Sequence, residues 1–352
     1  MVLVLGVSAG AGGARAILTH SDQPHLPPID SCLVARRPGR GVDEPVFDAI
    51  RQMCRSAEER DELIASTAVT CRCPLHAEAI RRAAGRTRLT IVDEPLAQLR
   101  YLRFTGRLPE SGSVILYDLG SSGLTLTQAD CRSEAVIAGT RSTVLGGDGY
   151  DLLLRRRLAR AGVRADRAAT RRHREELSSA RVVTAIDPES GDRAVLTHSD
   201  LADLCVAGVQ HSAALVRHLI EETGVPPAAL VLVGGCTRSP IVRSELVRAI
   251  DLPIVYDPEP EVVSARGAVL LAAERPSGDV HMPRVRTRAA LAALPRPGVG
   301  RRKVLAAAAV TVALGGAVAG LLALERDSAD RPGGGSAPTR IELGTVAPLP
   351  TK

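Results

Sequence analysis

Residues 230–240 (L-V-L-V-G-G-C-T-R-S-P) have the composition of a ligand-binding turn. The apolar start predicts a buried parallel strand, and Ser239 followed by Pro240 predicts the first turn of a helix. Between them, Gly234 and Gly235 bring bare backbone amides beside a helix N-terminus, which favours negatively charged ligands. This run alone supports a nucleotide site and a plain strand-to-helix connection about equally.

Three further segments fall in the order, and at roughly the relative positions, of one protein family. They are residues 91–96 (I-V-D-E-P-L), 114–125 (V-I-L-Y-D-L-G-S-S-G-L-T) and 145–151 (L-G-G-D-G-Y-D). Together with residues 230–240 they resemble the nucleotide-binding domain of the 70-kDa heat-shock chaperones, within the actin-like ATPase superfamily. The joint order is more specific than any single segment, so it favours the nucleotide interpretation.

This resemblance spans residues 2–274 and implies a fold. The implied fold is α/β and two-lobed, of the actin-like or heat-shock-70 ATPase type, with duplicated mixed sheets and flanking helices. Residues 176–180 look like the family's adenosine-side helix, and residues 260–268 look like its closing helix. No part of the chain resembles the peptide-binding domain that should follow, so the resemblance is to a truncated form.

The resemblance also implies site residues. Asp118 and Glu94 match two acids of the phosphoryl chemistry, with Asp118 holding Mg²⁺ indirectly. Each acid could instead cap a helix at a strand end, and Arg238 could be a solvated surface arginine. The positions that match nucleotide contacts are Gly10, Gly12, Gly120, Gly146, Gly147, Ser178, Gly234, Gly235 and Arg238.

Several charged groups of the family are missing from this chain. Ser8 stands where a magnesium-side aspartate is expected, Gly123 where a threonine is expected, and Thr125 where a second aspartate is expected. The only lysines are Lys303 and Lys352, so the phosphate-contacting lysine is absent from the matching region. Losing one preorganised charge-stabilising group costs about a hundredfold or more in rate. These losses predict weak or no hydrolysis.

The family's basic groups are replaced in two places. Arg51 is a candidate stand-in for the missing lysine, although arginine is not an equivalent point charge. Arg174 and Glu175 replace the basic pair beside the adenine, which predicts a weaker hold on the base.

Composition limits the core and the partners. With no Trp, two Phe and four Tyr, burial must come from Ala, Val, Leu and Ile, which suits strands packed between helices. The net charge of +6 is carried by scattered arginines without interleaved aromatics, which argues against nucleic acid as a partner. The seven cysteines are odd in number and lie mostly in apolar stretches, which predicts reduced thiols. Cys71, Cys73 and His76 lack an evident fourth metal ligand, so buried small residues are favoured over a metal site.

Local patterns predict the elements that hold these residues. A glycine turn at Gly10, Gly12 and Gly13 predicts a hairpin, and Asp93-Glu94-Pro95 predicts the end of a strand and the start of a helix. A long helix is expected from a Ser199 cap to about Thr223, with Gly224 after its end. Other predicted elements are strands at 68–70 and 89–92 and a helix at 76–84.

We expect residues 1–274 to form the nucleotide-binding domain. Lobe I is expected at about 1–135 plus 258–274, and lobe II at about 136–257. Residues 275–303 are interpreted as a basic, Pro/Gly-rich juxtamembrane linker.

A transmembrane helix is predicted at residues 304–324. These 21 residues carry no charge, and at about 1.5 Å per residue they can cross a bilayer core of ~30 Å. A buried core helix is the alternative, but apolarity on all faces favours the span. Residues 325–352 are expected to be a short disordered extracytoplasmic tail.

The charges around this span predict its orientation and location. The basic excess before it places the N-terminal domain in the cytoplasm, with a single pass through the plasma membrane. Gly316 and Gly320 share one helix face, where a second copy could approach to form a homodimer. Plain glycine usage in an alanine-rich span is the alternative.

The leading functional hypothesis is a membrane-anchored, heat-shock-70-like protein that binds ATP or ADP, optionally with Mg²⁺, and hydrolyses it weakly or not at all. It would act as a nucleotide-dependent conformational or scaffolding module for an unidentified protein partner. A second hypothesis is an active, chaperone-like ATPase working with a membrane partner, in which Arg51 or another group restores phosphate contact. A third is a structural envelope or secretion-associated anchor with a degenerate site.

Overall fold

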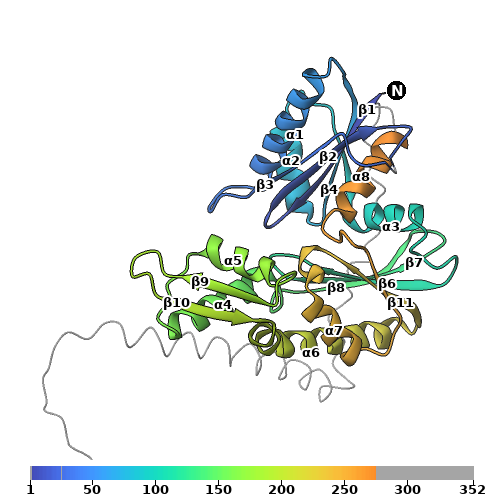
Figure 1. The fold of residues 1–352 in the computed structure, drawn as a ribbon. Helices are drawn as coiled ribbons and strands as arrows, with labels where there is room; N and C mark the ends of the chain where they lie inside the picture. Colours follow the sequence, from blue (N-terminus) through green and yellow to red (C-terminus); the bar gives the residue numbers. More distant parts are fainter. Residues whose placement is uncertain (1, 25, 275–352) are drawn as a thin grey trace, which may run out of the picture. The chain divides into compact units, whose positions relative to one another are not determined.

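The computed structural model describes residues 2–24 and 26–274, which form two five-stranded mixed sheets, a two-stranded sheet and flanking helices (Figure 1). The first sheet has the order β3-β2-β1-β4-β5, with β1 antiparallel to β2 and parallel to β4. Its strands are β1 Leu3–Gly10, β2 Gly13–His20, β3 Asp30–Ala35, β4 Ile64–Cys71 and β5 Thr90–Asp93.

Helices cover both faces of this sheet because its central strands are apolar on both sides. Leu5 and Val7 pack in one core cluster with Met53 of α1, while Val4 packs in another with Val269 of α8. This alternation follows from the two-residue period of a strand. The helices associated with the first sheet are α1 Asp43–Glu58, α2 Pro74–Ala84, α3 Glu94–Phe104 and α8 Val263–Glu274.

The second sheet repeats the arrangement of the first. Its order is β12-β11-β6-β7-β8, again an antiparallel three-strand meander followed by two parallel strands. The prediction of duplicated mixed sheets with flanking helices is therefore confirmed for the described residues. The strands are β6 Ser113–Leu119, β7 Leu124–Asp130, β8 Val136–Ser142, β11 Pro227–Val233 and β12 Ile254–Tyr256.

The second sheet is also apolar on both faces. Tyr117 and Leu232 point into the largest core cluster, where the Tyr117 hydroxyl donates to Ser212 Oγ at 2.9 Å. Leu116 and Val233 pack on the opposite face with Leu102 of α3. The remaining elements are α4 Gly147–Arg160, α5 Arg167–Glu176, β9 Val182–Ile186, β10 Arg193–Thr197, α6 His198–Thr223, the 3₁₀ helix η1 Gly235–Arg238 and α7 Pro240–Ala249.

Helix ends follow the predicted signals with one difference. Gly224 ends α6 in the left-handed conformation (φ +64°), and Pro240 occupies the first turn of α7. The expected cap at Ser199 is wrong, because Thr197 caps α6 in a reciprocal pair with Asp200. The Thr197 hydroxyl accepts from the Asp200 N–H, and the Asp200 carboxylate accepts from the Thr197 N–H.

Helix α8 returns the chain to the first sheet. A Cβ on Gly6 of β1 would lie 2.3 Å from the Ala265 carbonyl oxygen, and one on Gly267 would lie 1.8 Å from the Ala97 carbonyl oxygen. Only glycine permits these two backbone approaches, so α8 packs directly on β1 and α3. This places residues 263–274 with the first sheet, as expected for the closing segment.

The expected lobe boundary near residue 135 is wrong. Strands β6 and β7 pair with each other, and β6 also pairs with β11, so residues 113–130 belong to the second sheet. The chain passes from the first sheet to the second between α3 and β6. Local sequence does not reveal this boundary, because β6 pairs with β11 across about a hundred residues.

No helix within residues 2–24 and 26–274 is long and apolar enough to cross a membrane. The predicted span at residues 304–324, with Gly316 and Gly320, lies outside the described residues, as do the linker at 275–303 and the tail at 325–352.

Candidate functional site

The two predicted phosphate-side turns lie against each other. One joins β1 to β2 at Gly10, Gly12 and Gly13, and the other joins β6 to β7 at residues 120–123. A Cβ on Gly12 would lie 2.7 Å from Ser121 Oγ. The two turns are therefore neighbours, although they are more than a hundred residues apart in sequence.

The start of α4 joins the same group. The Gly147 N–H donates to the Gly120 carbonyl at 3.0 Å, and the Asp148 N–H donates to the Ser121 carbonyl at 2.8 Å. A Cβ on Gly146 would lie 2.5 Å from the Gly123 nitrogen. The glycines at 146 and 147 therefore let the N-terminus of a helix reach the second turn, where its dipole favours an anion.

The glycine pair after β11 lies beside Asp118. Gly234 has φ +85°, and a Cβ there would lie 2.5 Å from Asp118 Oδ1. Gly235 is exposed, and its added Cβ would lie at an ordinary 3.6 Å from Glu261 Cβ. Gly234 is thus required by the fold, whereas Gly235 leaves open surface beside the strand end.

Arg72 connects the two predicted acids. It follows β4 directly, and its Nη2 lies 2.5 Å from Asp118 Oδ2 while its Nε donates to Glu94 Oε2 at 2.8 Å. Asp118 is the penultimate residue of β6 in the second sheet, and Glu94 begins α3 after β5 of the first sheet. A single guanidinium therefore pairs with carboxylates from both sheets.

Two neutral side chains close this network into a ring. Gln98 Nε2 donates to Asp118 Oδ2 at 2.7 Å and to Ser264 Oγ at 3.0 Å. The Ser264 hydroxyl in turn donates to Glu94 Oε1 at 3.1 Å. Gln98 and Ser264 bring α3 and α8 into the site, and they were not among the predicted site residues.

Burial sets the charge state of this network. It raises the pKa of Glu94 above its ordinary value, and the positive charge of Arg72 opposes that rise. For Arg72, burial lowers the guanidinium pKa, but the charges of Asp118 and Glu94 outweigh it and the net shift is upward. Arg72 therefore stays charged, and its charge favours the ionised form of Glu94.

Arg51, the candidate stand-in for the missing lysine, is not part of this network. Arg51 lies on α1, where its side chain is 65% exposed and its guanidinium pairs with Asp48 of the same helix. Arg72 is the basic group that meets the acids, and sequence reasoning missed it because C-R-C-P matches no phosphate motif. Its place at the carboxyl end of a parallel strand was a usable signal, since β1, β4 and β5 all end at this edge.

A second buried ion pair lies on the predicted nucleoside side. Arg174 Nε lies 2.5 Å from Asp151 Oδ1, and the two side chains are only 12% and 4% exposed. A Cβ on Gly147 would lie 2.9 Å from Cys236 Sγ and 3.2 Å from Arg174 Nη2. Burial raises the pKa of the Cys236 thiol, and Arg174 opposes that shift. Arg174 therefore supports α4 and η1 from inside the fold.

The other predicted nucleoside-side residues are more accessible. Arg238 is 63% exposed at the end of η1, and its Nη1 lies 3.1 Å from Glu261 Oε1. Ser178 is half-buried just after α5, where its N–H donates to the Glu175 carbonyl. Glu175 itself is exposed and pairs with Arg171 at 2.8 Å.

The residues at the phosphate side do not fit a hydrated Mg²⁺. That ion is held through carboxylates and their bound waters, and Asp118 already accepts from Arg72 and Gln98. Ser8 lies in β1 opposite Thr70 of β4, so the first turn contributes a hydroxyl in place of a carboxylate. Thr125 accepts a hydrogen bond from Arg72 Nη1 at 2.8 Å. The Arg72 guanidinium thus contacts Asp118 Oδ2, Glu94 Oε2 and Thr125 Oγ1.

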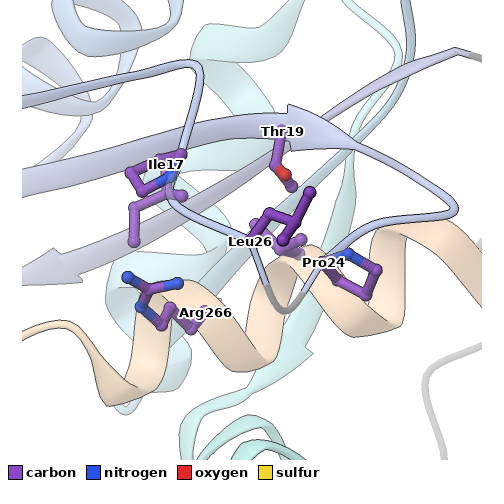
Figure 2. Close-up of a pocket in the computed structure, with 7 residues that line it drawn as sticks. Ile17, Thr19, Pro24, Leu26 and Arg266 are labelled. Carbon is purple, nitrogen blue, oxygen red and sulfur yellow. The ribbon is translucent and has the colours of Figure 1, made fainter.

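A small depression lies elsewhere on the first sheet. Figure 2 shows Leu26 and Pro24, from the segment between β2 and β3, above α8 and beside Ile17 and Arg266. Its lining is mainly apolar and includes none of the predicted site residues. It therefore does not change the assignment of the candidate site.

Comparison with known proteins finds similarity to chaperones over about half of the chain. The chain is 31% identical over 221 residues to the chaperone protein HscA homolog of Burkholderia ambifaria (strain MC40-6), covering 56% of this chain and 35% of that protein. The homolog from Burkholderia cenocepacia (strain HI2424) is 30% identical over 221 residues, with the same coverage. The chaperone protein HscA of Salmonella arizonae is 28% identical over 205 residues, covering 54% and 33%.

No protein-family model matches the chain. The matched region spans about a third of the length of the curated relatives. Similarity to HscA chaperones over half of this chain, and two mixed α/β sheets with flanking helices, fit a nucleotide-binding domain of the heat-shock-70 type.

Proposed function

We propose that this chain binds ATP or ADP where its glycine turns meet. The observation that carries the proposal is the convergence of the turn at 120–123 with Gly12, with Gly147 and, through Asp118, with Gly234. Backbone amides and a helix N-terminus suit a polyphosphate. The exposed Gly235 and Arg238 leave a surface for the nucleoside.

We propose further that hydrolysis is weak. Catalysis of phosphoryl transfer needs groups that position water and stabilise the developing charge. In the described part of the chain, both predicted catalytic acids are already held by Arg72, and Ser8 and Thr125 stand where acids are expected. Bound nucleotide would therefore persist and act as a structural signal.

The proposed role is a membrane-anchored conformational or scaffolding module for an unidentified protein partner. The apolar residues 304–324 and the basic residues before them support a single pass of the plasma membrane, with the nucleotide-binding domain in the cytoplasm. Arg72 supports a conformational role, since it joins carboxylates from both sheets and lies where a phosphate would compete for it.

Nucleotide-dependent thermal stabilisation of the full chain tests binding. Ligand at 100 times its dissociation constant should add about 2.7 kcal/mol to the free energy of unfolding. Adding ATP or ADP is expected to raise the Tm of the parent. The Gly235→Val variant is expected to show no such rise, while its Tm without nucleotide stays equal to that of the parent. The absence of any rise with either nucleotide would support the structural-anchor hypothesis instead.

Protease accessibility tests the membrane topology. A tag placed after Lys352 should be removed by protease added to intact cells, while a tag on the N-terminus should be protected. Removal of the N-terminal tag alone would contradict the proposed orientation.

A further inference from the structure

One row of residues across the second sheet places three polar side chains together. Asp118 of β6 is opposite Thr125 of β7, which is opposite Arg141 of β8. Residues directly opposite on neighbouring strands project to the same face of a sheet. A carboxylate, a hydroxyl and a guanidinium therefore line up beside the turn at 120–123.

Two guanidinium groups meet at Thr125. Its Oγ1 accepts from Arg72 Nη1 at 2.8 Å and from Arg141 Nη1 at 3.0 Å. Arg141 Nη2 also donates to Ser122 Oγ, within the turn, at 2.8 Å. Among the described residues, Arg141 hydrogen-bonds to these hydroxyls and forms no ion pair with a carboxylate, so its charge is not neutralised.

Further positive charge lies near Arg72 and Arg141. His76 of α2 has its pKa lowered by burial and further by the charges of Arg36 and Arg141. Arg36 is held at the first glycine turn, where its N–H donates to the Gly12 carbonyl at 3.1 Å. Arginines 36 and 141 thus flank the two turns that converge in the candidate site.

The local charge balance disfavours a divalent cation and favours an anion. Arg72 contacts both Asp118 and Glu94, whereas Arg141, on the same row as Asp118 and two strands away, adds a positive charge that is paired with no described carboxylate. Mg²⁺ needs an excess of oxygen ligands with negative charge, whereas a guanidinium fork fits phosphate oxygens.

We propose that the site takes the phosphates of a nucleotide without Mg²⁺, with Arg141 as the principal phosphate-binding side chain and Arg72 in place of the metal's charge. The inference rests on the nucleotide binding proposed above. It deepens that proposal by naming the metal-free nucleotide as the ligand.

Calorimetric titration of the full chain with ADP, in excess EDTA and in Mg²⁺, tests the inference. ADP is expected to bind in EDTA at least as tightly as in Mg²⁺. The Arg141→Gln variant is expected to bind ADP about tenfold more weakly in EDTA, the loss of one charge-assisted contact of about 1.4 kcal/mol. Its affinity for adenosine should not change.

Arg51→Gln is the matched control, since it removes an exposed arginine of α1 whose ion pair is with Asp48 of the same helix. It should leave both affinities unchanged, and its Tm and that of Arg141→Gln should match the parent. ADP binding that is lost in EDTA and restored by Mg²⁺ would overturn this inference and leave nucleotide binding intact. Unchanged ADP affinity in Arg141→Gln would also overturn it. Failure to bind ADP and adenosine in both conditions would contradict the proposed function itself.

Discussion

Arg72 of the first sheet and Asp118 of the second are in direct contact, with Nη2 and Oδ2 2.5 Å apart. Because Arg72 also pairs with Glu94, one side chain holds the carboxyl ends of β4, β5 and β6 together. A phosphate arriving at the glycine turns would compete with these carboxylates for the guanidinium. If nucleotide binds as proposed, its phosphates and the contact between the two sheets are linked through Arg72.

Removing the Arg72 charge should destabilise the protein. In Arg72→Gln two acids of low exposure lose their cation, and loss of one partner of a buried ion pair typically costs 3–5 kcal/mol. We expect the free energy of unfolding, measured by chemical denaturation, to fall by about 3 kcal/mol. This is the lower end of the typical range, because the Arg72 side chain is 27% exposed. Arg51→Gln should change the unfolding free energy by less than about 0.5 kcal/mol. Equal losses in the two variants would contradict this role for Arg72.

The raised pKa of Glu94 predicts a pH dependence of stability. A carboxyl whose pKa is higher in the folded than in the unfolded state contributes stability below its ordinary pKa of 4.5, and that contribution is lost as pH rises through the folded pKa. Glu94→Gln removes this titration, so its Tm should fall less than that of the parent from pH 4.5 upward. Glu78→Gln, at a half-exposed acid on α2, is the control and should keep the parent's pH profile. Identical profiles for the parent and Glu94→Gln would refute the prediction.

The two glycines after β11 should respond differently to alanine. Gly234→Ala forces a Cβ to within 2.5 Å of Asp118 Oδ1 at φ +85°, so it should lower the Tm without ligand. Gly235→Ala adds a Cβ at 3.6 Å from its nearest neighbour, so its Tm should match the parent. ATP should raise the Tm of Gly235→Ala by less than it raises the Tm of the parent, and this should be the variant's only difference. A large loss of Tm in Gly235→Ala would show that the added Cβ is not tolerated there.

The Arg174–Asp151 pair should show strong coupling. Arg174→Gln leaves the Asp151 carboxylate, which is 4% exposed, without its ion-pair partner. The free energy of unfolding is expected to fall by about 3–5 kcal/mol. The double variant Asp151→Asn/Arg174→Gln should lose less unfolding free energy than the two single variants lose together, because neither charge is left unpaired. Arg172→Gln, an exposed neighbour on α5, should be neutral. Simple additivity in the double variant would argue against a direct pair.

Local chemistry made much of this fold predictable. Gly224 and Pro240 mark helix boundaries through backbone geometry alone, and both are found where expected. The glycines of the converging turns were likewise identified because their motifs are contiguous in sequence. The Ser199 cap was wrong by two residues because Thr197 completes a reciprocal pair with Asp200.

The ionic part of the site was not predictable in the same way. Arg72 contacts both acids only because β4 lies beside β5 in the first sheet and Asp118 of the second sheet lies next to it. Gln98 and Ser264 are separated by 166 positions along the chain and meet only after α8 returns to α3. Such contacts depend on long-range packing, for which neither periodicity nor motif spacing carries a signal.

The central claim is that nucleotide is bound and retained without efficient turnover. Its most direct test is to mix the full chain with a substoichiometric amount of γ-labelled ATP, isolate the bound nucleotide over time, and measure the fraction still present as ATP. We predict that the label is bound and stays as ATP, with release of phosphate little faster than in protein-free buffer. Rapid conversion of bound ATP to ADP, abolished by Asp118→Asn, would contradict the account and establish the chain as an active ATPase.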